Sequence, residues 1–160
     1  MPEAEDNTHI VMHAVPVWLE QTEAWLFNQI ASLPDDVTSH ILCERTANFR
    51  QFYLPNVFNL AKSTMPESLK ITSRGELTFY AQRLLGWHSS YAADVMNRLG
   101  IQLLHSHYGT TGFHHLDAAR QAGVPHVVTF YGFDLHKVLA TDPAWKWRYA
   151  QLFEEVDLVL

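Results

Sequence analysis

The sequence predicts an α/β domain in which helices cover both faces of a mostly parallel β-sheet, giving a three-layer α/β/α sandwich. Segments with strand-like patterns alternate along the chain with segments that have the 3.6-residue period of helices. The strand segments include nearly continuous apolar runs, such as residues 10–17, which are typical of buried strands. Gly100 and Gly123 each follow a helical segment, where a glycine commonly ends a helix.

The first half of the chain carries three of the predicted strands. Residues 10–17 form the first, and we expect it to end near Pro16, which cannot donate a ladder hydrogen bond. Thr22 is a candidate N-cap for a helix over residues 23–32, whose apolar side chains recur at helical spacing. The next two strands are predicted over the ranges 37–43 and 56–60.

The middle of the chain predicts a surface loop followed by one long helix. Residues 62–74 are polar and irregular, which favours a loop. The helix is expected over residues 76–99 and should end at Gly100. One apolar stripe repeats along it at steps of three and four residues, which we interpret as core. The stripe consists of Tyr80, Leu84, Trp87, Tyr91 and Val95.

Two compact strand-and-helix units follow, and the chain stops inside a last apolar segment. The strands are predicted over 103–107 and 126–130, and the helical segments over 110–122, 134–139 and 143–154. Residues 156–160 again have the pattern of a buried strand. A domain rarely stops inside such a strand, so we expect residues 1–160 to be a single domain within a longer two-domain chain. Residues 1–8 are short, polar and acidic, and we expect them to be flexible.

The composition narrows the classes of partner. The net charge of −6 and the lack of a long basic cluster disfavour nucleic-acid binding. The single cysteine, Cys43, excludes an intramolecular disulfide and fits a reducing compartment. No secretory signal and no apolar stretch of membrane-spanning length are present. We therefore expect a cytoplasmic protein. A peripheral contact with the inner face of the membrane is consistent with this location.

Three loops are expected to form the ligand site, because ligands of open α/β sheets bind beyond the carboxyl ends of the strands. They are residues 16–23, 107–112 and 131–134. Each places polar groups and a helix N-terminus beside a strand end, which favours anionic or hydroxyl partners. Gly109, Gly112 and Gly132 let a ligand approach the backbone closely. For any one of them taken singly, a tight turn is the more common explanation.

Other chemistries are less well supported. No Gly-x-Gly-x-x-Gly and no Walker-A lysine occur, which disfavours nicotinamide and P-loop chemistry. His105 and His107 share one face of a strand, and Asp134 or His136 could supply a third metal ligand. We nevertheless expect no metal, with His105 half-buried and hydrogen-bonded and His107 pointing into the cleft.

Three blocks of the sequence resemble segments of family-4-like glycosyltransferases. Residues 103–109, LLHSHYG, resemble the family's HxHFG segment. Residues 116–134, LDAARQAGVPHVVTFYGFD, resemble the family's LARLLGIPxVVTxHGxD. Residues 21–30, QTEAWLFNQI, are similar to SETFxxxQI, which is a weaker match. The resemblance covers nearly the whole chain, as the N-terminal domain of that family.

The resemblance implies one Rossmann-like half of a two-domain GT-B enzyme, with the active site in the cleft between the halves. The N-terminal half of such enzymes mainly holds the acceptor, here a glycan or a lipid-linked molecule. A C-terminal domain or subunit would bind the nucleotide-sugar donor, so this half alone would be inactive and would need no other cofactor. The family generally retains the anomeric configuration and uses no metal.

The resemblance also assigns residues to the site. Tyr131 would lie near the reacting centre, where the family often has His. Because a Tyr hydroxyl does not titrate near neutrality, we expect no general-base role for it. The family's Gly-Gly turn after the first strand is missing here, so the start of the following helix should take its place. The substrate-binding residues would be Thr22, Glu23, His107, Tyr108, Gly109, Gly112, Gly132 and Asp134.

Two alternatives stay open from the sequence. One is a complete, non-enzymatic Rossmann-like module that binds a ligand or pairs with a separate subunit. The other is an unrelated α/β hydrolase-like or metal-dependent enzyme.

Overall fold

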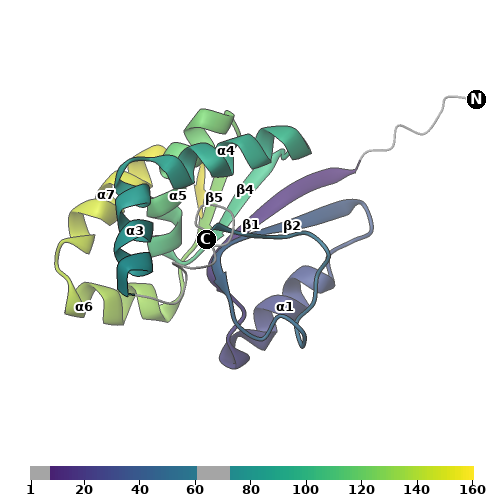
Figure 1. Ribbon diagram of the computed structural model, residues 1–160, viewed down its shortest axis with the longest axis horizontal. Helices are drawn as coiled ribbons and strands as arrows, with labels where there is room; N and C mark the ends of the chain where they lie inside the picture. Colours follow the sequence, from purple (N-terminus) through teal and green to yellow (C-terminus); the bar gives the residue numbers. More distant parts are fainter. Residues whose placement is uncertain (1–7, 61–72) are drawn as a thin grey trace, which may run out of the picture.

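The computed structural model describes residues 8–60 and 73–160, which form one six-stranded sheet with helices on both faces (Figure 1). All neighbouring strands pair in parallel, in the order β3-β2-β1-β4-β5-β6. The strands are β1 (His9–Trp18), β2 (Val37–Thr46), β3 (Val57–Asn59), β4 (Leu103–His107), β5 (His126–Thr129) and β6 (Leu158–Val159). The predicted fold class, a Rossmann-like α/β/α domain, is confirmed.

The helices divide between the two faces of the sheet. They are α1 (Ala24–Ala31), α3 (Ser73–Leu84), α4 (Trp87–Leu99), α5 (Gly109–Ala122), α6 (Leu139–Thr141) and α7 (Trp145–Glu155). In Figure 1, α1 lies on one side of β1 and β2, and α4 and α5 lie on the other. Two short helical turns, η1 (Gln21–Glu23) and η3 (Asp134–Val138), follow the ends of β1 and β5.

The alternation of side chains along β1 builds a separate core on each face. Met12 and Ala14 are fully buried in the core that α4 and α5 cover. Val15 is buried on the opposite face, in the core that α1 covers. Because successive side chains of a strand point to opposite faces, His13 shares the α1 face with Val15. The central strand thus carries a buried histidine on the face that α1 covers.

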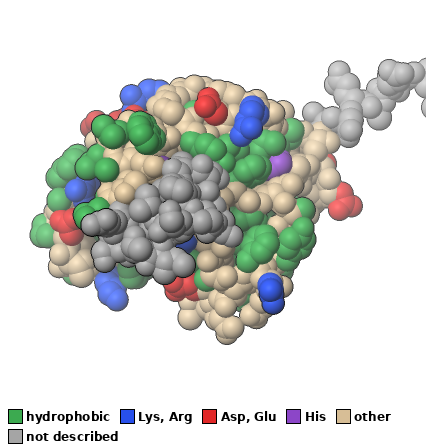
Figure 2. All heavy atoms as spheres, viewed as in Figure 1, with side chains coloured by type: hydrophobic (Ala, Val, Ile, Leu, Met, Phe, Trp, Pro, Cys, Tyr) green, Lys and Arg blue, Asp and Glu red, His purple; other side chains and the backbone are tan. Residues whose placement is uncertain are grey.

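The helix predicted over residues 76–99 is two helices. Gly86 has φ +73°, in the left-handed region, and it separates α3 from α4. The chain changes direction there, so the apolar side chains before and after the break do not form one buried stripe. Leu84 is 88% exposed and Trp87 is 57% exposed. Figure 2 shows apolar side chains at several places on the surface of the face that it views. Of the predicted stripe, only Val95 is fully buried.

Most of the other predicted elements are confirmed, with shifts at their ends. β1 continues past Pro16 to Trp18, because Val15 and Val17 keep the pairing with β2 on either side of the proline. Gly100 and Gly123 adopt φ +64° and φ +68° at the ends of α4 and α5, as predicted.

Three expectations for segments outside the predicted sheet have different outcomes. The N-cap position of α1 falls at Glu23 and no side chain caps it, so the predicted cap at Thr22 is wrong; the turn η1 comes first. The loop predicted over 62–74 lies outside the described residues up to residue 72, and α3 already begins at Ser73. The expected flexible start falls on residues 1–7, which are also outside them.

In the parts of the chain that the structure describes, none of the helices has the length and apolar character needed to cross a membrane.

Candidate functional site

The candidate site lies near the carboxyl ends of β1, β4 and β5. The connections from β1 lead to β2 on one side, whereas those from β4 lead to β5 on the other, so β1 and β4 flank the topological switch point of the sheet. Ligands of open α/β sheets bind at this point. Parallel pairing places His13 of β1 directly beside His105 of β4.

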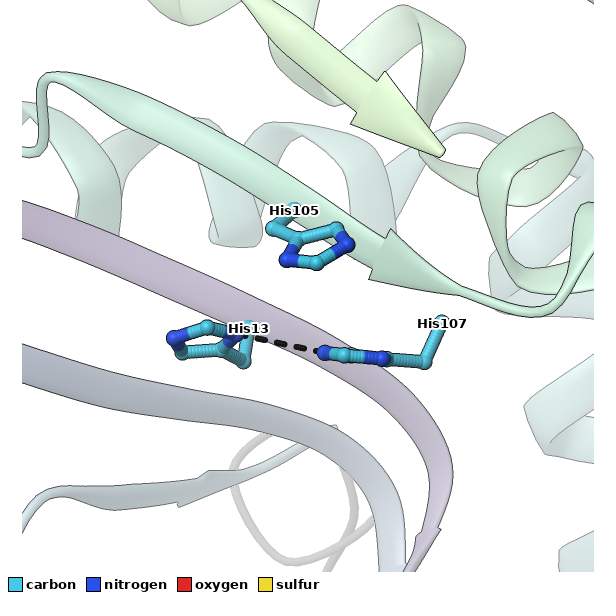
Figure 3. Close-up of side chains that lie close together, drawn as sticks. All are labelled: His13, His105 and His107. Atoms are coloured by element: carbon cyan, nitrogen blue, oxygen red, sulfur yellow. Dashed lines mark hydrogen bonds between the residues drawn. The ribbon is translucent and has the colours of Figure 1, made fainter. Parts of the chain in front are cut away.

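Three histidines form the centre of this region (Figure 3). His13 Nδ1 lies 3.2 Å from His107 Nε2, and the ring centres of His105 and His107 are 4.3 Å apart. His13 and His107 are 4% and 1% exposed, and His105 is half-buried. In Figure 3 the rings of His13 and His107 meet end to end, and the His105 ring lies over the gap between them.

Burial keeps these imidazoles neutral. It lowers the pKa of His13 to about 3, and the neighbouring His105 adds to the effect. Burial likewise lowers the pKa of His107 to about 2, with smaller contributions from His105 and His13. The pKa of His105 is lowered by burial as well. At neutral pH each ring therefore keeps one nitrogen with a free lone pair.

Hydroxyl groups of β5 and of the loop after it hold two of the three rings. His105 Nε2 lies 2.8 Å from the Thr129 hydroxyl, and His107 Nδ1 lies 2.9 Å from the Tyr131 hydroxyl. The expectation that His105 is half-buried and hydrogen-bonded is confirmed. The side chain of His107, in contrast, does not face an open cleft, because β1 and Tyr131 occupy both of its nitrogens.

A second contact joins the helix starts after β1 and β4. The Tyr108 hydroxyl donates to Glu23 Oε1 at 2.6 Å. Tyr108 has φ +78°, and it is the one described residue other than glycine with a positive φ. Such a conformation is costly for a tyrosine and is kept only where the surroundings fix it. Burial and the bond to Glu23 raise the pKa of the Tyr108 hydroxyl, which therefore stays protonated.

Asp134 fastens the loops after β4 and β5 to each other. Its side chain is fully buried, and its two oxygens accept the backbone N–H groups of Gly109 at 3.1 Å and Tyr131 at 3.0 Å. Burial raises the pKa of this carboxyl, and the backbone hydrogen bonds oppose the increase. We expected Asp134 to bind an acceptor hydroxyl in the cleft, but both oxygens instead hold backbone groups.

Two glycines of α5 allow it to pack closely against β5 and against Phe130, which follows β5. A Cβ on Gly109 would lie 2.3 Å from the Phe130 ring, and one on Gly112 would lie 2.7 Å from a methyl group of Val128. Both are buried, so their role here is the close approach of helix and strand. Gly132 and Thr22 are exposed at the rim of the region.

The structure thus brings together six of the predicted residues: Glu23, His107, Tyr108, Gly109, Tyr131 and Asp134. Two important side chains were missed. His13 was counted only as part of an apolar strand, although a histidine within such a run was itself a usable signal. Trp25 of α1 is 42% exposed, and its ring meets that of Tyr131 edge-on at 5.0 Å.

The exposed Trp25 thus lies beside the half-buried Tyr131 in this region. Burial raises the pKa of the Tyr131 hydroxyl to about 12, with the carboxylates of Asp134 and Glu23 adding to it. Tyr131 can thus donate or accept a hydrogen bond at neutral pH but cannot act as a base. A hollow of about 470 Å³ lies elsewhere, around the start of β5 and the end of α5.

Comparison with known proteins defines the fold but no family. No protein-family model and no curated protein matches the sequence. Among solved structures, a UDP-N-acetylglucosamine 2-epimerase matches with a TM-score of 0.55 and 12% identity, over 96% of this chain and 41% of the epimerase chain. The fold is therefore Rossmann-like, and this chain is similar in fold to part of the epimerase chain. The chain spans less than half the length of the enzyme that it resembles.

Proposed function

We propose that this chain is the acceptor-side half domain of a GT-B enzyme that uses a nucleotide sugar, and specifically of a retaining glycosyltransferase. The acceptor would be a glycan or a lipid-linked molecule reached at the cytoplasmic face of a membrane. The donor would bind to a C-terminal domain or a separate subunit, so this half alone would not transfer sugar.

The observation that carries the proposal is the pair of Tyr131 and Trp25 at the switch point of the sheet. The Tyr131 hydroxyl is held by His107 Nδ1 at 2.9 Å and stays protonated at neutral pH. The exposed part of the Trp25 ring lies beside it. A sugar ring presents an apolar face and a rim of hydroxyl groups, which an aromatic side chain next to a fixed hydroxyl complements.

Rigid neighbours support this pair on both sides. Asp134 fixes the backbone of Tyr131, and the bond between Tyr108 and Glu23 joins the start of α1 to that of α5. Groups that are held in place before binding lose little freedom when a ligand arrives, which favours affinity.

The test uses the full-length protein with labelled nucleotide sugars and a lipid and glycan extract as the acceptor source. We expect transfer of label to an acceptor, with a product of the same anomeric configuration as the donor. Tyr131→Phe should raise the KM for the acceptor about 2- to 10-fold by removing one hydrogen bond, and Trp25→Ala should raise it about 10-fold. The KM for the donor should not change.

Trp147→Ala is the matched control, because Trp147 is 57% exposed on α7 and has ring contact with Phe113 instead of Tyr131. Equal acceptor KM values for the Trp25 and Trp147 variants would remove Trp25 from the acceptor site. A failure to transfer label from any donor would contradict the glycosyltransferase proposal.

A second candidate is epimerisation of a nucleotide sugar, which the solved structure of similar fold suggests. The same incubation distinguishes the two functions. An epimerase converts the labelled nucleotide sugar to a second nucleotide sugar without an acceptor, whereas a transferase releases free nucleotide only when an acceptor is present.

A further inference from the structure

We propose that His13, His105 and His107 bind one divalent transition-metal ion, with zinc as the expected occupant. This site goes beyond sugar transfer and does not depend on it. One nitrogen from each of the three imidazoles lies within 4.8 Å of the other two. The residues come from two neighbouring strands in fixed register, which is a rigid support for a metal site.

The spacing of the nitrogens fits tetrahedral coordination. Zinc binds histidine nitrogen at about 2.0–2.1 Å, so two ligands at a tetrahedral angle lie about 3.3–3.4 Å apart. His13 Nδ1 and His107 Nε2 are 3.2 Å apart. One nitrogen of each ring lies within 4.8 Å of one nitrogen of each of the other two, so shifts of up to ~1.5 Å would bring every pair to this separation.

The hydrogen bonds around the rings match those that orient metal ligands. Metal-binding histidines usually donate their second N–H to a neighbouring oxygen. Here His105 Nε2 faces the Thr129 hydroxyl and His107 Nδ1 faces the Tyr131 hydroxyl. These contacts leave His105 Nδ1 and His107 Nε2 for the metal, and Figure 3 shows both rings turned toward His13.

His13 would supply its Nδ1 as the third ligand. Its side chain is 4% exposed, and its Nε2 has no hydrogen-bond partner among the described residues. In the metal-free protein, either His13 Nδ1 or His107 Nε2 carries the proton of the hydrogen bond between these two rings. When the metal takes His13 Nδ1, that ring keeps its single proton on Nε2, so no net proton release is required.

The donor atoms select the class of ion. Three imidazoles favour zinc, copper, nickel or iron, whereas magnesium and calcium prefer oxygen ligands. Three protein ligands leave the fourth tetrahedral position open for water or another small ligand. Asp134 is not available as a fourth ligand, because backbone N–H groups occupy both of its oxygens.

The test measures zinc binding to the tag-free, chelator-treated full-length protein by competition with a chromogenic chelator. We expect one equivalent of zinc, and X-ray absorption at the zinc edge should give a first shell dominated by three imidazole nitrogens. Loss of an outer hydrogen-bond partner typically weakens metal binding about 10- to 100-fold, so His105→Asn, which removes a ligand, should weaken it at least about 100-fold. Thr129→Val should give the smaller, 10- to 100-fold loss.

His136→Asn is the control, because His136 is exposed on η3 and lies outside the cluster. It should leave the affinity unchanged. Absence of stoichiometric binding, or equal affinities of the His105 and His136 variants, would overturn the proposal. His105 is half-buried, so its variant is the least disruptive of the three, and circular dichroism checks its fold. If even that variant does not fold, the absorption spectrum of the wild type decides: a shell of oxygen ligands alone would refute the site.

Discussion

Replacement of Asp134 by Asn should destabilise the domain without a change in side-chain size. The carboxylate is fully buried and accepts the N–H of Gly109 on one oxygen and that of Tyr131 on the other. An amide side chain has one oxygen and one NH₂ group. In either orientation of the amide, one backbone N–H therefore faces another donor and loses its partner.

The size of the effect follows from these two bonds. A hydrogen bond to a charged group contributes about 1.5–3 kcal/mol, and a buried donor without a partner costs about 1–3 kcal/mol. Part of this loss is offset, because burial raises the pKa of Asp134, which means that the fold penalises its charge. We expect a net loss of about 2 kcal/mol, or roughly 4–8 °C in Tm for a domain of this size.

Urea unfolding followed by circular dichroism measures this loss, with Asp117→Asn as the matched control. Asp117 is 62% exposed and pairs with Arg120 on the surface of α5. Its replacement should change the free energy of unfolding by no more than about 0.5 kcal/mol. If the Asp134 variant were as stable as the Asp117 variant, Asp134 would not fasten the two loops as described.

Three further predictions concern other contacts. Gly112→Ala should cost about 1–3 kcal/mol of stability, because the new methyl would lie 2.7 Å from Val128, and Val128→Ala in the same chain should recover part of it; additive losses in urea unfolding would argue against that clash. Burial lowers the pKa of His126 to about 3, so between pH 6.5 and pH 3 the unfolded chain binds a proton at this residue that the folded chain does not. Lowering the pH through this range therefore destabilises the fold, and the loss of stability relative to neutral pH is about 2 kcal/mol at pH 5. His126→Gln should reduce the loss of stability between pH 7 and pH 5 by about that amount, and an unchanged loss would assign the acid sensitivity to other groups. Tyr108→Phe should lower Tm by roughly 2–4 °C through loss of the bond to Glu23, and Glu23→Gln should lower it less, because its amide oxygen can still accept that bond.

The sequence was most informative where structure is decided locally. The strand–helix–strand unit over residues 103–130 has its strands and helix close to the predicted bounds, because the glycine at 123 and the apolar runs act over short distances. The helix break at Gly86 was missed for the opposite reason. A glycine within a helical pattern is often tolerated, and nothing in the local pattern indicates that this one adopts a positive φ.

The site was predicted only in part, because it depends on strand order. His13 meets His105 and His107 because β1 pairs with β4, a neighbour that no local pattern specifies. The sequence identified the polar residues after each strand but not which of them would face inward. Asp134 illustrates this limit. An aspartate after a strand is typical of a ligand-binding residue, but this one accepts hydrogen bonds from the backbone of two loops.

The central position of β1 also sets the timing of folding during synthesis. β1 pairs with β2 soon after it emerges, but its other neighbour, β4, follows about 90 residues later. At roughly 5–20 residues per second, one edge of the most buried strand waits about 5–18 s for its partner. An unpaired apolar strand edge invites association with other chains. The nascent chain should therefore depend on chaperones most strongly in the interval before residue 107 emerges, and the three histidines can first meet only when that interval ends.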